Sequence, residues 1–135
     1  MKFAKYVFYI AGIYGLIVLA PQYFLESKTG KDFPPAITHP EYFYGFIGVA
    51  LAFQIVFLII ARNPQKYRAM IIPSIIEKFS FAAATVALYL QGRLAGTMLA
   101  AGLIDLTLGT LFIASYIFLL KEPEKQMRPQ SQSSF

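Results

Sequence analysis

The stretch "MIIPSIIEKFSFAAATVALYL", residues 70–90, decides the fold class of this chain. Almost all of it is apolar, and its only charges are the adjacent Glu77 and Lys78. A hydrocarbon core of roughly 30 Å needs about 20 apolar helical residues at a rise of about 1.5 Å each. The stretch is therefore long enough to cross a bilayer as a helix, and its two charges then lie where an isolated charge is expensive.

Three further apolar segments reach the same length, at residues 6–25, 42–61 and 94–120. With residues 70–90 they predict an all-α integral membrane bundle of four transmembrane helices over residues 1–120. A polar loop, residues 26–41, separates the first two helices, whereas "RNPQKYR" and "QGR" are short connectors. Short connectors predict that the second, third and fourth helices are antiparallel neighbours. Residues 121–135 are polar and without apolar periodicity, which predicts a disordered cytoplasmic tail.

The composition supports a membrane protein and excludes several other classes. Of 135 residues, 57% are hydrophobic and only 14% are charged, and the mean hydropathy is +0.56, which is too apolar for an ordinary soluble domain. The net charge of +5 is scattered over loops and ends, so it does not indicate nucleic acid as a partner. The absence of cysteine excludes disulfides and thiolate chemistry, and the single histidine excludes a multi-histidine metal or haem site. No nucleotide-binding, zinc-hydrolase or catalytic-triad motif is present, so the sequence favours a non-enzymatic protein and encodes no recognisable cofactor site.

The orientation follows from lysine and arginine, which resist translocation. Eight of them fall on one side (Lys2, Lys5, Arg62, Lys66, Arg68, Lys121, Lys125 and Arg128) and three on the other (Lys28, Lys31 and Arg93). This asymmetry predicts cytoplasmic termini. A cleaved signal peptide is an alternative for the first segment, but Pro21 follows the expected cleavage point and "QYFL" extends the apolar run, so a retained helix is favoured.

Polar residues within the spans are the candidate site. Counting depth at about 1.5 Å per residue brings five of them to one level: Tyr14, Gln54, Glu77, Lys78 and Asp105. Neighbouring helical residues project about 100° apart, so Glu77 and Lys78 are not expected to neutralise each other, and Lys78 is expected to pair with Asp105 instead. Three interpretations stay open: a lysine that snorkels to the headgroups, a structural ion pair, and a ligand or proton site.

The sequence contains two further patterns outside this layer of polar residues. At the outer surface, His39 and Glu41 form a candidate for proton exchange, with no metal implied. Two small residues four positions apart form a face of a helix that another helix can approach closely. Each predicted helix has one such candidate face: Ala11 with Gly15, Gly48 with Ala52, Ser80 with Ala84, and Gly96 with Ala100.

The pattern "HPEYFYGFIGVALAFQIVFLIIARNPQKYRAMIIPSIIEKFSF" followed by "GLIDLTLGTLFIASY" resembles small bacterial four-helix membrane proteins of the DoxX-like group. The basic connector, "EK" and the late aspartate are its distinctive points. The resemblance implies a location in a bacterial inner membrane and a link to membrane redox or quinone-dependent systems, and it transfers no catalytic residue. A likeness to small multidrug transporters is weaker, because they carry their key acid in the first helix, where this chain has none.

Three functions are compatible with these features. The first is a membrane partner or assembly subunit, for example of a redox system, whose polar layer fixes helix register. The second is a binder of a lipid-like or quinone-like molecule. The third is a proton-coupled transporter acting as a dimer. The expected partners are the lipid bilayer and other membrane proteins or a second copy of the chain. The sequence favours the first function.

Overall fold

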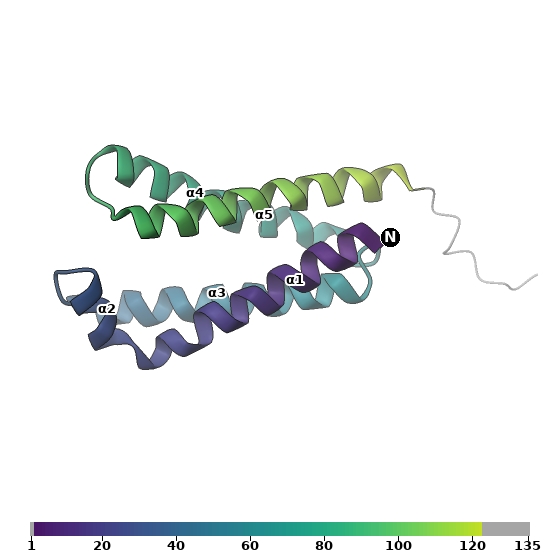
Figure 1. Ribbon diagram of the computed structural model, residues 1–135. Coiled ribbons are helices and arrows are strands. Elements are labelled where there is room, and N and C mark those ends of the chain that lie inside the picture. Colours follow the sequence, from purple (N-terminus) through teal and green to yellow (C-terminus); the bar gives the residue numbers. More distant parts are fainter. Residues whose placement is uncertain (1, 123–135) are drawn as a thin grey trace, which may run out of the picture.

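The protein is a helical bundle, described by a computed structural model over residues 2–122 (Figure 1). The four long helices are α1 (Lys2–Leu19), α3 (Pro40–Arg62), α4 (Ile71–Leu90) and α5 (Gly96–Lys121). Each is long and apolar enough to cross a membrane, which confirms the predicted all-α class with four spans. The tail predicted for residues 121–135 lies, from residue 123 onward, outside the described residues.

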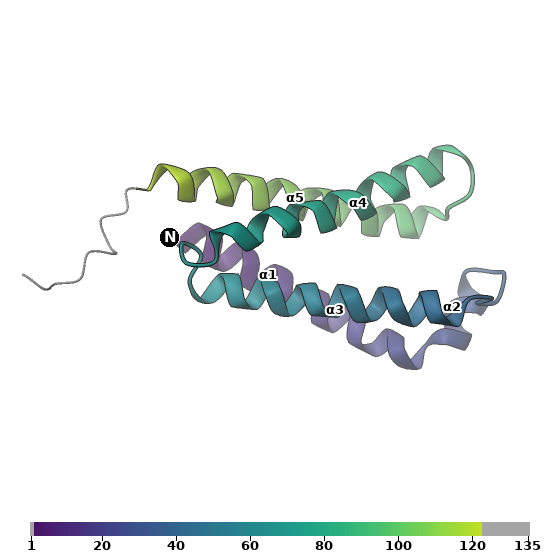
Figure 2. The same cartoon turned by 180° about the vertical axis from the view of Figure 1, so that it is seen from behind.

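The helices are arranged as two antiparallel pairs, α1 with α3 and α4 with α5 (Figures 1 and 2). The short "QGR" turn makes α4 and α5 neighbours, as predicted. The main neighbour of α3, however, is α1, and its contact with α4 is slight. Both views show the two pairs diverging toward the end that carries α2 (Glu26–Asp32).

Glycines explain why each pair is close. A Cβ atom on Gly15 of α1 would lie 1.8 Å from Gln54 Oε1 of α3, and a Cβ on Gly102 of α5 would lie 1.8 Å from Thr85 Oγ1 of α4. The predicted Ala11–Gly15 face is buried against the bundle. Nothing lies within 4 Å of a Cβ atom placed on Gly96, so the prediction that another helix packs against the Gly96–Ala100 face is wrong at Gly96. Dispersion between closely approaching backbones holds such pairs together in lipid.

The pairs are joined by aromatic rings near the start of α1. Phe8 of α1 stacks on Phe112 of α5 with ring centroids 4.2 Å apart, and Phe57 of α3 meets Phe112 edge to face at 5.0 Å. All three side chains are fully buried. This cluster fixes one end of the bundle, whereas no equivalent cluster of buried aromatics closes the opposite end among residues 2–122.

Two boundaries differ from the sequence prediction. The first helix begins at Lys2 and ends at Leu19, where the chain continues as a 3₁₀ helix, η1 (Ala20–Phe24), because Pro21 lacks the N–H that an α-helix needs. The expected loop of residues 26–41 contains α2, which a Lys28–Asp32 ion pair of 2.6 Å supports. A second 3₁₀ turn, η2 (Arg68–Met70), leads into α4.

Candidate functional site

Lys78 lies at the centre of a buried cluster of three charges between α4 and α5. Its Nζ donates a hydrogen bond to Asp105 Oδ1 at 3.2 Å and lies 3.5 Å from Glu77 Oε2. The exposed fraction is 6% for the Lys78 side chain, 15% for Asp105 and 18% for Glu77. The pairing of Lys78 with Asp105 is the one predicted from depth, and Gly109 makes room for it by bringing α5 against the Lys78 stem.

One expectation about Lys78 is wrong, and one of the three open interpretations does not fit its position. The flexible lysine stem bends back far enough to reach Glu77 as well, although the two Cα–Cβ vectors diverge. The ammonium also does not snorkel to the headgroups: it is buried, and it lies 5.2 Å from the centre of the Phe57 ring. Lys78 therefore belongs to the interior of the bundle.

The cluster has one carboxylate more than it has cations. Lys78 gives its hydrogen bond to Asp105, and Glu77 Oε2 is buried without a hydrogen-bond partner among residues 2–122. A buried polar atom without a partner costs about 1–3 kcal/mol, and more when it is charged. Glu77 therefore offers a strong acceptor to any donor that reaches it.

Glu77 also lines a groove of about 480 Å³ between α3 and α4. Phe46 and Phe81 form its aromatic wall, with ring centroids 6.0 Å apart and planes within 27°. Gly45 widens the groove, because nothing lies within 4 Å of where its Cβ would be. The groove exists because α3 and α4 belong to different pairs, which diverge at this level. It can hold an apolar molecule with one polar head.

The other members of the predicted layer do not join the three charges. Gln54 is 1% exposed, and its Nε2 donates to the Ala50 carbonyl at 2.8 Å, while its Oε1 faces Gly15 and has no partner among the described residues. Tyr14 is 37% exposed on the outside of α1. Gln54 thus fills the α1–α3 interface, and Tyr14 lies on the outer surface of the bundle.

The outer-surface candidates do lie together. His39 Nδ1 is 3.3 Å from Glu41 Oε1, and both side chains are more than 60% exposed. The two residues are only two positions apart in the sequence, so their contact does not depend on the packing of the bundle. Within residues 2–122, no group of three or more metal-ligating side chains comes together.

Sequence reasoning missed the walls of the groove. Ser80 and Phe81 follow Glu77 by three and four residues, so helical spacing places them on its face, and this signal was readable. The residues of α3 gave no such signal, because its sequence does not tell which face meets α4. In comparisons with known proteins, the chain matches no family model, no curated protein and no solved structure.

Proposed function

We propose that this bundle binds an amphiphilic molecule, either lipid-like or the reduced quinol form of a quinone-like one, whose hydroxyl donates a hydrogen bond to Glu77. One observation carries the proposal: the buried Oε2 of Glu77 has no hydrogen-bond partner among the described residues, and its side chain lines an apolar groove. A hydroxyl donor supplies the hydrogen bond that Glu77 Oε2 lacks, because the Lys78 ammonium, 3.5 Å away, forms an ion pair with Glu77 but gives its hydrogen bond to Asp105.

The groove suits a flat or chain-like apolar body. Its volume of about 480 Å³ falls within the range of about 300–1,000 Å³ that is usual for small-molecule sites. Phe46 and Phe81 favour an aromatic ring, such as that of a quinol, by offset stacking. Phe46 is 49% exposed to the surroundings of the bundle, so the ligand enters from the hydrocarbon region.

The placement in the membrane forms part of this proposal. The end of the bundle where α1 begins and α5 ends faces the cytoplasm, because the lysines and arginines gather there; within the described residues these are Lys2, Lys5, Arg62, Lys66, Arg68 and Lys121. The resemblance to the DoxX-like group stays a prediction that no contact in the structure tests.

A substitution at Gly45 tests the groove without disturbing the fold. Gly45→Leu adds a side chain where no atom lies within 4 Å, so it fills the groove while the helix stays intact. Gly96→Leu is the matched control, since its Cβ position is equally free but lies outside the groove. Native mass spectrometry of the purified protein should show a stoichiometric small ligand in the wild type and the control, and none in Gly45→Leu.

Glu77→Gln tests the polar contact. The amide keeps the shape of the side chain but weakens the acceptor, so we expect retention of the ligand to fall at least tenfold, which corresponds to about 1.4 kcal/mol. Glu41→Gln, at the exposed outer surface, should leave retention unchanged. Adding a quinol or a diacylglycerol to ligand-free protein distinguishes the two sources of the hydroxyl, and a wild type that retains neither refutes the binding function.

A partner or assembly subunit is the second candidate function. The open flank at Gly45 favours it, because small residues let a helix of another membrane protein approach closely. Gly45→Leu would then remove a bound protein instead of a small molecule. The same mass measurement separates the two functions, because the lost mass is that of a polypeptide in one case and that of a lipid or quinol in the other.

A further inference from the structure

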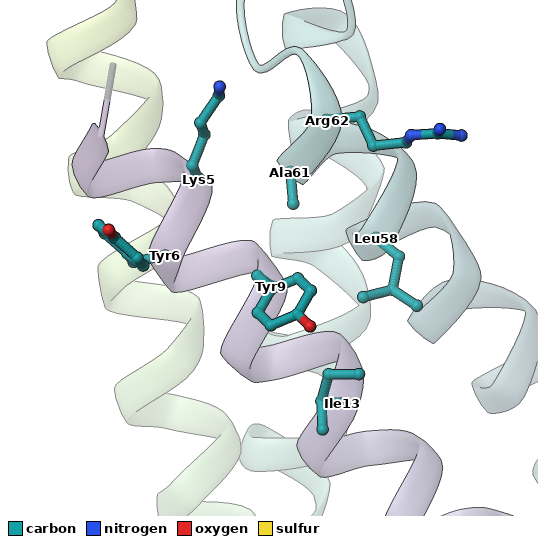
Figure 3. Close-up of a pocket in the computed structure, with 7 residues that line it drawn as sticks. All are labelled: Lys5, Tyr6, Tyr9, Ile13, Leu58, Ala61 and Arg62. Carbon is teal, nitrogen blue, oxygen red and sulfur yellow. The ribbon is translucent and has the colours of Figure 1, made fainter.

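A second groove lies between α1 and α3, at the end of the bundle opposite α2 (Figure 3). Its volume is about 440 Å³. Lys5 of α1 and Arg62 of α3 stand at one end of it, and Tyr9, Ile13 and Leu58 lie further along its length. The groove is therefore cationic at its end and apolar along its walls.

The two cations are available to a ligand. In the part of the chain that the structure describes, the salt bridges are made by Lys28, His39 and Lys78, and neither Lys5 nor Arg62 takes part in one. Both side chains are exposed. Figure 3 shows the two side chains pointing apart, so both turn toward the end of the groove when they contact one anion there.

The length of the groove matches one leaflet. Ile13 follows Lys5 by eight residues, which corresponds to about 12 Å along a helix that rises about 1.5 Å per residue. Half of a hydrocarbon core of roughly 30 Å is about 15 Å. Tyr6, near the charged end, is of the kind that gathers at headgroup level. The cations thus lie at the headgroups, and the apolar wall runs beside the acyl chains.

We propose that this groove binds an anionic phospholipid, with its phosphate on Lys5 and Arg62 and one acyl chain along Tyr9, Ile13 and Leu58. The arginine fork bonds two phosphate oxygens, and the lysine ammonium adds a point charge. Charge complementarity selects this occupant, because a zwitterionic lipid brings its own cation to the same place and an uncharged lipid leaves both cations unpaired. The site is separate from the Glu77 groove and does not depend on its ligand.

The test compares lipids on the full chain in detergent. Native mass spectrometry is run with equal amounts of phosphatidylglycerol and phosphatidylcholine that carry the same acyl chains. The wild type should retain phosphatidylglycerol preferentially. The double variant Lys5→Gln with Arg62→Gln should lower that retention about 30-fold. This factor corresponds to a loss of about 1 kcal/mol for each of the two basic residues near the lipid surface.

Matched variants separate this groove from the general charge of the surface. Lys66→Gln with Arg68→Gln removes the same charge from the same end of the bundle but outside the groove, and should change retention less than threefold. Ile13→Trp fills the groove from an exposed position, keeps both cations, and should reduce retention at least tenfold.

Three outcomes of the lipid comparison overturn the proposal, and a competition experiment adds a fourth. The three are equal retention of the two lipids by the wild type, an equal loss in the two double variants, and full retention by Ile13→Trp. An excess of glycerol phosphate should not displace the lipid, because it lacks the acyl chain. Displacement by glycerol phosphate would show a phosphate site without a lipid groove, and would also refute the proposal.

Discussion

Lys78→Met is expected to lower the free energy of unfolding by about 3–5 kcal/mol, the usual cost of removing one partner from a buried ion pair. Methionine keeps the length and apolar stem of lysine, so packing against Phe57 changes little. The ammonium, however, lies 3.2 Å from Asp105 and 3.5 Å from Glu77, and its removal leaves two carboxylates facing each other in an apolar interior. Few other substitutions in the bundle would leave so much uncompensated charge.

Asp105→Asn should cost less, about 1.5–3 kcal/mol, which is the contribution of a hydrogen bond to a charged group. Lys78 keeps Glu77 as a counter-ion in this variant, so no charge is left alone. Replacing all three, as Glu77→Gln, Lys78→Met and Asp105→Asn together, should return stability to within about 1 kcal/mol of the wild type, since a buried ion cluster is weak evidence for net stabilisation.

The assay is unfolding in mixed micelles of mild detergent and increasing dodecyl sulfate, followed by far-ultraviolet circular dichroism. Wild type, single variants and the triple variant are compared at one protein concentration. The reasoning is refuted if Lys78→Met costs less than about 1 kcal/mol, the range of an exposed ion pair. It is equally refuted if Asp105→Asn costs more than Lys78→Met, or if the triple variant is no more stable than Lys78→Met alone.

Three further outcomes are expected. Gly15→Ala should destabilise the protein by about 1–3 kcal/mol, because its methyl would meet Gln54 Oε1, and adding Gln54→Ala should recover most of that loss in the same unfolding assay. Gly45→Ala should instead stabilise it by up to about 1 kcal/mol, because the added methyl meets nothing and glycine weakens a helix; destabilisation would contradict the open groove. Because the chain has no cysteine, a single cysteine at Thr38 or at Lys66 can be labelled in whole cells, and only the Thr38 variant should react with an impermeant thiol reagent; the reverse result would refute the proposed orientation.

The charge cluster shows which part of the site was readable before the structure. Depth along a helix is a one-dimensional quantity, so counting residues was enough to bring Lys78 and Asp105 to one level and predict their pairing. Counting residues does not tell which way a helix is rotated about its axis, nor which path a flexible lysine side chain takes. For that reason the contact of Lys78 with Glu77 and the outward position of Tyr14 were predicted wrongly.

The sequence by itself determined four helices that are long and apolar enough to cross a membrane, because the length of an apolar run and the thickness of the bilayer leave a chain few other choices. It did not determine how those helices pair. Lipid solvates every apolar face equally well, so hydrophobic pattern carries little information about which face is inside. Only the tertiary structure decided that α1 rather than α4 is the main partner of α3, through the fit of Gly15 to Gln54. That pairing leaves α3 and α4 apart and opens the groove at Glu77, the feature on which the proposed function depends.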